Sequence, residues 1–385
     1  MYQNYPYFCM VTSQKLSARP LRKTIRTLLL TLLGLLFRLT AQGQVLENIW
    51  RERIMHLGPL YGGPDTLSMV IIGDVMMHAR QLEYDCTPFL ERISDRFRNA
   101  DIAVANMEFP LGGTPYAGYP VFSAPDAYAD YVAGLGVNVF LTANNHVLDR
   151  GKAGLRRTLE KYRDMDGVRI AGCAEDEKAD STAFPLLLAE KGLRIALVNF
   201  TYGTNMGPSE GWPKVHTEDK EDIARAFERA RRLGADFIVA LPHWGVEYDL
   251  RHSGRQERLA QWLAEQGADA IVGSHPHVVQ DSSRIGRTPV FYSLGNAVSN
   301  MSATNTRLEL MVTLRFTKDR TGRTEMLPPQ VDFLWCTLPG TLTDNYAVIF
   351  VREYIDRRDL WKNPYDYDNM VATYRRVKAA TGIED

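Results

Sequence analysis

The stretch "ADAIVGSHPH" (residues 268–277) is a short apolar run that breaks into small and polar residues. A run of this length, bounded by turn residues, is typical of a buried strand. It ends in His275 and His277, one on either side of Pro276. Imidazole is a common metal ligand, although a His-x-His pair can also stand in a solvated loop. Pro276 is expected to push His275 toward an extended conformation and so to stiffen the loop.

Six further segments rise through apolar residues and break in the same way: 67–74, 100–108, 137–146, 193–200, 235–244 and 288–296. Between them lie helical patterns, most clearly in residues 218–234 and 254–267, which both stop at glycine. This alternation predicts an α/β fold with a largely parallel or mixed central sheet. Residues 307–335 indicate antiparallel strands around a Lys-Asp-Arg-Thr-Gly turn, and residues 363–381 indicate a C-terminal helix.

The first forty or so residues have the layout of a secretory signal peptide. A basic segment (19–26) precedes an apolar run (28–37) and a small-x-small cleavage pattern (41–43). The run is too short to span a bilayer comfortably, and an uncleaved N-terminal anchor is the alternative. We therefore expect a signal peptide at residues 1–43, a lead-in segment at residues 44–66, and an exported protein of the periplasm or cell envelope.

Composition is ordinary for a globular protein with a sizeable core, with 45% hydrophobic and 24% charged residues in a chain of 385. Residues 1–43 carry six Lys/Arg and no Asp/Glu, so their removal would leave 39 basic and 46 acidic residues, a net charge of −7. This balance argues against nucleic acid as a partner, which calls for a basic footprint. Cys86, Cys173 and Cys336 form neither a disulfide framework nor a Cys-x-x-Cys metal motif.

Polar residues collect at the carboxyl ends of the predicted strands, which is where ligands bind in open α/β sheets. In chain order they are Asp74, Asn106, Glu108, Asn144, Asn145, His146, His243, His275, His277, Ser293 and Asn296. Each has an ordinary explanation when taken singly, as a turn cap, a surface carboxylate or a core histidine. Jointly they indicate a site, because four of the eight histidines of the chain lie at strand ends beside carboxylates or carboxamides. His56, His216 and His252 show no such placement.

Carboxylate, carboxamide and imidazole groups without a thiolate suit divalent ions of the Mn, Fe or Zn class. A pair of such ions can clamp a phosphoryl or carbonyl centre and lower the pKa of a bridging water. An imidazole outside the ligand shell can then protonate the leaving group. The sequence offers no Walker loop, dinucleotide fingerprint or Gly-x-Ser-x-Gly elbow. Metal-assisted hydrolysis is therefore the chemistry that these residues support best.

Six motifs in this order resemble those of the bacterial capsule-synthesis CapA family, which is associated with poly-gamma-glutamate capsules and is related to the calcineurin-like metallophosphatases. They are "GDVMMH" (73–78), "NMEFPL" (106–111), "TANNHVLDRG" (142–151), "PHWGVEY" (242–248), "GSHPHVVQ" (273–280) and "YSLGN" (292–296). The resemblance covers roughly residues 67–300. It implies a four-layer α/β/β/α sandwich. We expect the domain to span residues 67–335 and a C-terminal extension, residues 336–385, to pack on it.

The resemblance also implies a role for each strand-end residue. A first metal would be held by Asp74 and His277, and Glu108 would sit at the position of the bridging carboxylate. A second metal would be held by Asn145, His243 and His275, with His146 as the general acid. Possible additional site residues are His78, Asn106, Asn144 and Asn296.

Two motifs depart from the metallophosphatase pattern. Metallophosphatases open with Asp-x-His, whereas His78 lies four residues after Asp74 rather than two. Their second motif, Gly-Asp-x-x-Asp, is here Asn106-Met107-Glu108. One metal or two therefore remains open, and His78 either serves as a ligand or lines the substrate cleft.

The leading hypothesis is a metal-dependent hydrolase or transferase that acts on an acidic or phosphorylated cell-surface polymer such as poly-gamma-glutamate. One alternative is a non-catalytic polymer-binding or assembly component that works with other capsule-machinery proteins. Another is a phosphoesterase for a small-molecule substrate, which predicts a closed pocket. Residues 201–215, rich in Gly and Pro, are either a lid or cleft wall of the site or an ordinary surface loop.

Overall fold

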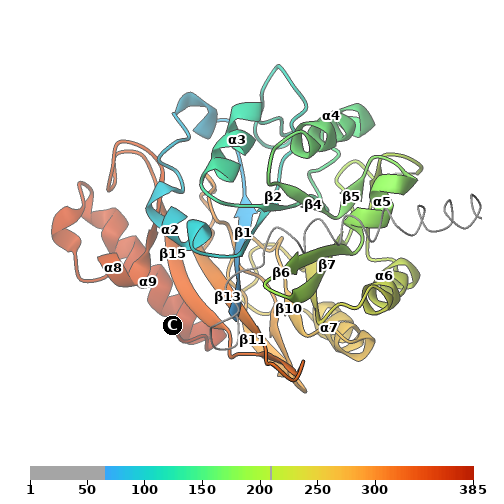
Figure 1. The fold of residues 1–385 in the computed structure, drawn as a ribbon. Helices are drawn as coiled ribbons and strands as arrows, with labels where there is room; N and C mark the ends of the chain where they lie inside the picture. Colours follow the sequence, from blue (N-terminus) through green and yellow to red (C-terminus); the bar gives the residue numbers. More distant parts are fainter. Residues whose placement is uncertain (1–65, 209) are drawn as a thin grey trace, which may run out of the picture. The chain divides into compact units, whose positions relative to one another are not determined.

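The computed structural model describes residues 66–208 and 210–385, so the predicted signal peptide and nearly all of the lead-in segment lie outside the described residues. Two large mixed sheets dominate the described part (Figure 1). No helix in these residues is both long enough and apolar enough to cross a membrane.

The first sheet has eight strands, in the order β16-β15-β13-β1-β2-β3-β4 with β14 paired to β13. Its parallel half comprises β1 (Thr66–Val75), β2 (Ile102–Met107), β3 (Val139–Leu141) and β4 (Arg169–Ala171). Its antiparallel half comprises β13 (Leu308–Lys318), β14 (Thr324–Met326), β15 (Gln330–Thr337) and β16 (Ala347–Phe350).

The second sheet has six strands, in the order β11-β12-β10-β9-β7-β6. Its parallel strands are β7 (Leu193–Thr201), β9 (Phe237–His243), β10 (Ala270–Val272) and β12 (Thr288–Phe291). Antiparallel β6 (Leu186–Glu190) and β11 (Ser282–Ile285) form its edges, and β5 (Cys173–Ala174) pairs separately with β8 (Lys214–Val215).

Apolar side chains from both sheets fill one shared core between them. They include Ile71, Val104 and Leu141 from the first sheet and Leu197, Val239 and Val272 from the second. Because side chains alternate along a strand, the neighbouring residues face outward and must be covered by helices.

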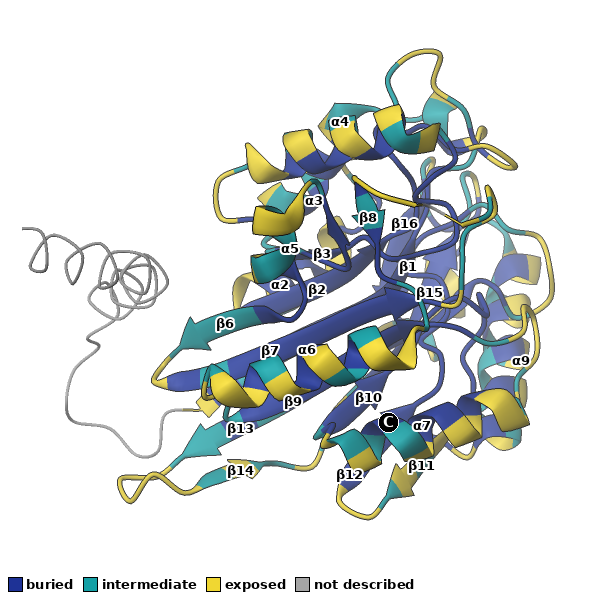
Figure 2. Cartoon of the chain, turned by 90° about the vertical axis from the view of Figure 1, so that its right-hand side faces the viewer, coloured by how far each residue is buried: buried dark blue, intermediate teal, exposed yellow. Residues whose placement is uncertain are grey.

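Helices cover the outer face of each sheet. Over the first sheet lie α2 (Ser94–Arg98), α3 (Asp126–Gly134) and α4 (Gly151–Arg163). Over the second lie α6 (Lys220–Arg232) and α7 (Gly254–Gln266), whose outward sides are exposed (Figure 2). The remaining short helices are α5 (Glu177–Ala183), α8 (Val351–Tyr354), η1 (Gln81–Glu83), η2 (Glu91–Ile93) and η3 (Arg358–Leu360). The predicted α/β/β/α sandwich is confirmed.

The last part of the chain belongs to the same compact unit. Strand β16 extends the first sheet, and α9 (Pro364–Thr381) packs Met370 and Val377 against the inter-sheet core. A buried, bidentate ion pair between Arg307 and Asp366 links α9 to the residue just before β13, with N–O distances of 2.5 and 2.8 Å. The predicted antiparallel strands and C-terminal helix are therefore confirmed.

Candidate metal centre

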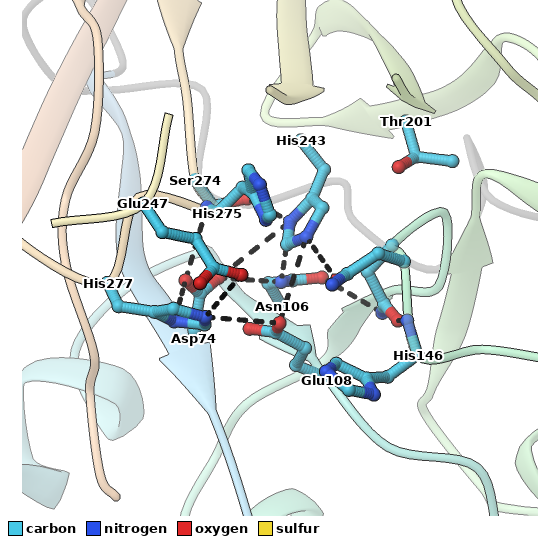
Figure 3. A network of polar contacts seen from close by, with 12 residues as sticks. Asp74, Asn106, Glu108, His146, Thr201, His243, Glu247, Ser274, His275 and His277 are labelled. Carbon is cyan, nitrogen blue, oxygen red and sulfur yellow. Dashed lines mark hydrogen bonds and ion pairs between the residues drawn. The ribbon is translucent and has the colours of Figure 1, made fainter. Parts of the chain in front are cut away.

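The strand-end residues converge between the two sheets (Figure 3). Asp74, Asn106 and Glu108 come from β1 and from the end of β2, whereas His243 ends β9 and His275 and His277 follow β10. All six side chains are buried. The two sheets meet here directly, since the backbone N–H of His275 donates to Oδ2 of Asp74 at 3.2 Å.

A bulge in β1 aims the carboxylate of Asp74 into this space. The pairing of β1 with β2 shifts register between Ile72 and Asp74, and the N–H of the intervening Gly73 donates to Oε1 of Glu309 at 2.7 Å. Only glycine fits here, because a Cβ on residue 73 would lie 2.0 Å from the carbonyl oxygen of Gly295. Burial alone would raise the pKa of Asp74, but hydrogen bonds and charge from the neighbouring histidines outweigh it and lower the pKa to about 2.

Asn106 and Asn144 hold the site together. Nδ2 of Asn106 donates to Oδ1 of Asp74 at 2.7 Å, and Oδ1 of Asn106 accepts from Nδ2 of Asn144 at 3.3 Å. Asn144 also donates to the carbonyl of Met107 and accepts the backbone N–H of His146 at 3.2 Å. These contacts position the neighbouring strand ends.

Glu108 is the least satisfied group in the site. Both of its carboxylate oxygens are buried without a hydrogen-bond partner, and Oε1 lies 3.8 Å from Nε2 of His243 and 3.9 Å from Nε2 of His277. Burial, followed by the charge of Asp74, raises the pKa of Glu108 well above its usual range. Buried polar atoms are normally paired, so an unpaired carboxylate facing two imidazoles fits a bound cation.

His243 presents one nitrogen to the same space. Its Nδ1 lies 2.9 Å from Oγ of Ser274, and its Nε2 lies 2.9 Å from Oδ1 of Asn145. Burial, followed by the charge of His275, lowers the pKa of His243 well below its usual value. Burial likewise lowers the pKa of His275 to about 3. Both rings are therefore neutral near pH 7, which is the form that binds a metal.

The loop after β10 differs from its predicted conformation. Pro276 was expected to make His275 extended, but His275 has φ 102° and His277 has φ 59°. Both values are in the left-handed region, which disfavours residues with a Cβ. Tertiary hydrogen bonds override the local preference, because Asp74 accepts the N–H of His275 and the carbonyl of Pro276 accepts the N–H of Tyr248 at 2.9 Å.

Two groups of possible ligand atoms, each spanning at most 4.8 Å, share Glu108. One group joins Glu108 to His243 and His275, and the other joins it to Asp74 and His277. This membership coincides with the two metal positions and the bridging carboxylate that the resemblance implies. Asn145 adjoins the first group through His243, and Oδ1 of Asn296 lies 2.9 Å from Nδ1 of His277. Asn296 therefore leaves Nε2 of His277 to face Glu108.

His146 lies beside these groups rather than in them. Its Nδ1 is 2.7 Å from Oδ2 of Asp149, and its ring packs edge-on against Phe122 with centroids 4.7 Å apart. Nδ2 of Asn205 lies 3.4 Å from Nε2 of His146, and the N–H of Asn205 donates to the carbonyl of Asn145 at 2.9 Å. Asn205 thus brings this part of the segment 201–215 beside His146, and the choice between a cleft wall and an ordinary surface loop stays a prediction.

His78 is not brought into a ligand group among the described residues. Its Nδ1 accepts the backbone N–H of Asn300 at 3.2 Å, and its ring packs edge-on against Phe122, which also contacts His146. His78 thus lies beside the site without joining a ligand group, and its place in a substrate cleft stays a prediction. His216 and His252 are structural, each packing flat on an aromatic ring and contacting a carboxylate.

Glu247, Ser274, Asp149 and Asn205 are neighbours of the site that sequence reasoning missed. Glu247 joins His275 and His277 in a third group of possible ligand atoms. Ser274 and Asp149 lie inside the quoted motifs, so their position next to a strand-end histidine was the available signal. Asn205 carried no such signal, because it comes from the loop after β7.

The four layers and the ligand groups at the strand ends together define an α/β/β/α protein with a candidate metal centre between its two sheets. The chain matches the family model described as bacterial capsule synthesis protein PGA_cap over residues 68–301. It therefore belongs to the bacterial capsule synthesis family, as the motifs predict.

Two relatives carry capsule names. The PGA biosynthesis protein CapA of Bacillus subtilis (strain 168) is 30% identical over 279 residues, which is 69% of this chain and 71% of that protein. The capsule biosynthesis protein CapA of Bacillus anthracis is 28% identical over 295 residues, covering 72% and 71%. The solved structure of Haemophilus influenzae NAD nucleotidase is similar with a TM-score of 0.45 and 12% identity, over 82% of this chain and 68% of that one.

Proposed function

We propose that this chain is an exported, metal-dependent hydrolase or transferase of capsule biosynthesis that acts on an acidic or phosphorylated cell-surface polymer such as poly-gamma-glutamate. Membership of the capsule synthesis family supports the process. One observation carries the chemistry: the buried carboxylate of Glu108 has no hydrogen-bond partner and lies between Nε2 of His243 and Nε2 of His277.

The residues of the site would have two roles, metal binding and proton donation. Glu108, His243, His275 and the side-chain oxygen of Asn145 would hold one divalent ion, while Asp74, Glu108 and His277 would hold another. Bound there, a divalent ion supplies Lewis acidity and lowers the pKa of a coordinated water. When it carries a proton on both ring nitrogens, His146, with Nδ1 held by Asp149, would deliver the proton on Nε2 to the leaving group and keep the one on Nδ1.

Export and partners are part of the same proposal. The basic, apolar and small-residue pattern of residues 1–43 supports an exported protein of the periplasm or cell envelope. Cations held in the site would attract an acidic or phosphorylated polymer, and other capsule-machinery proteins would be the partners.

A second candidate is a non-catalytic component that grips the polymer through its metal. The observation that favours it is the position of His78, which the structure holds outside the ligand groups. The metal position near Asp74 then has fewer histidine ligands than the metallophosphatase motif provides.

The test compares the full-length chain with a double variant, His243→Ala with His275→Ala, and with the control His252→Ala outside the site. Each protein is loaded with Mn²⁺ or Zn²⁺, analysed for bound metal, and offered phosphodiester and gamma-glutamyl substrates. We expect metal-dependent turnover that the double variant loses and the control keeps. A wild-type chain without bound metal, together with an unaffected capsule in cells carrying the double variant, overturns the proposal. Metal and polymer binding without turnover would support the second candidate instead.

A further inference from the structure

We infer that Glu247 is a ligand of the metal position built around His277, where it takes the place of the histidine that the first metallophosphatase motif supplies. The inference rests on the proposed metal-dependent function and extends it to a residue for which the sequence predicted no role. Glu247 lies in the loop after β9 of the second sheet, four residues after His243, at which β9 ends.

The loop that carries Glu247 is hydrogen-bonded to the loop after β10 that carries His275 and His277. The N–H of Trp244 donates to the carbonyl of Ser274 at 3.0 Å, and the N–H of Tyr248 donates to the carbonyl of Pro276 at 2.9 Å. Gly245 turns the chain between them with φ 105°, a left-handed value that glycine adopts without strain. Glu247 is thereby held beside the two histidines although its side chain is 42% exposed (Figure 3).

The carboxylate of Glu247 lies near Nε2 of His277, the ring nitrogen that Asn296 does not engage. Nδ1 of His277 is engaged by Asn296 at 2.9 Å. Nε2 of His277 lies 4.0 Å from Oε1 of Glu247 and 3.9 Å from Oε1 of Glu108. Two donors of one tetrahedral ion lie about 3.3–3.6 Å apart when the metal–ligand bonds are about 2.0–2.2 Å, so each carboxylate would need to move only about 0.5 Å closer to Nε2 of His277.

A second observation points to a ligand at the same place. The third group of possible ligand atoms joins Glu247 to His277, and it also includes His275, which the proposed function assigns to the other ion. His78, the other candidate for this position, belongs to no group of possible ligand atoms among the described residues. Glu247 would therefore bring the protein ligands of this ion, with Asp74, Glu108 and His277, to the four that are usual for zinc.

The test measures metal binding by the full-length wild-type chain and by Glu247→Gln. Asp249→Asn is the matched control, because it removes the same charge from the same exposed loop but lies outside the ligand groups. Titration calorimetry with Zn²⁺ gives the number of ions and each Kd, and the visible absorption of Co²⁺ reports the ligand number and geometry. Melting temperatures in chelator check that all three proteins are folded.

We expect Glu247→Gln to lose one ion or to raise its Kd at least about tenfold, and to change the Co²⁺ spectrum, while Asp249→Asn behaves as wild type. Glu247→Gln with wild-type stoichiometry, affinity and spectrum overturns the inference and leaves the proposed function standing. So does an equal loss of affinity in Asp249→Asn with an unchanged spectrum, which would show a charge effect only. A wild-type chain that binds no metal overturns the proposed function itself.

Discussion

Nδ1 of His146 lies 2.7 Å from Oδ2 of Asp149, and both side chains are buried. The same carboxylate oxygen accepts the backbone N–H of Phe122 at 2.8 Å, while the Phe122 ring packs against the imidazole. The carboxylate therefore fixes the ring and favours a proton on Nδ1, so that Nε2 is the nitrogen available to a substrate.

Replacing Asp149 by Asn should impair proton donation to the leaving group. We expect turnover of a substrate with a poor leaving group to fall by about 10²–10⁴-fold, the usual contribution of general acid catalysis. A nitrophenyl substrate should be much less affected, because its leaving group needs no proton. Kinetics on the two substrates would check this, and an equal fall on both would contradict a role through His146.

The bulge at Gly73 should tolerate no side chain. In Gly73→Ala the new Cβ would meet the carbonyl oxygen of Gly295 at 2.0 Å, so we expect a loss of about 1–3 kcal/mol or more in the free energy of unfolding. Gly134→Ala is the control, since a Cβ there meets nothing within 4 Å. Urea unfolding measures both, and equal stabilities would show that β1 can relax around the substitution.

The buried pair of Arg307 and Asp366 should matter far more than a surface pair on the same helix. Asp366→Ala leaves a buried guanidinium without its partner, which costs about 3–5 kcal/mol. Asp368→Ala, which removes the exposed partner of Arg358 at 3.1 Å, should cost less than about 1 kcal/mol. Denaturant unfolding of the two variants tests the contrast. Similar losses would mean that Arg307 finds another partner.

The lowered pKa of Asp222 should make the stability of the folded state depend on pH. Burial alone would raise its pKa, but Nδ1 of His216 at 2.8 Å and Nζ of Lys214 at 2.9 Å outweigh burial and lower the pKa below its ordinary value of 3.8. A lowered carboxylate pKa stabilises the folded state above pH 3.8 and loses that effect as the pH falls through the lower, folded-state value.

The variant Asp222→Asn should therefore be less stable than wild type at pH 6, by about 1–3 kcal/mol. The difference should shrink as the pH falls below 3.8. Thermal unfolding from pH 6 down to the acid limit of folding measures it. A difference that is constant over this range would show that the carboxylate charge contributes nothing.

Metal should stabilise the folded chain through Glu108. A ligand that binds only the folded state at a hundred times its Kd adds about 2.7 kcal/mol, so Zn²⁺ or Mn²⁺ should raise the Tm and chelator should reverse the rise. Glu108→Gln should abolish most of this shift. Without metal it should be at least as stable as wild type, because it removes a buried carboxylate that has no partner. A full metal-induced rise in the variant would exclude Glu108 as a shared ligand.

Much of the fold followed from local patterns. All seven predicted strands are present as β1, β2, β3, β7, β9, β10 and β12, and both predicted central helices are present as α6 and α7. Helix α7 begins at a capping box on Ser253 and ends at Gly267 with φ 101°, both of which are signals within a few residues. Strand β3 stops at Leu141, earlier than its apolar run predicted. Thr142 still donates its N–H to Ala171 of β4, but the N–H of Ala143 turns to Oδ1 of Asn199.

By itself the sequence determined which residue types stand at the strand ends, because each apolar run and the polar residues that end it are consecutive in the chain. Only the tertiary structure decided how they meet. His275 and Asp74 are 201 residues apart and touch because the two sheets pack face to face. The same packing holds His275 in a left-handed conformation against its local preference, places His78 outside the ligand groups and brings Glu247 beside His277. Contacts over such separations have no local signal, since they depend on the path of the whole chain.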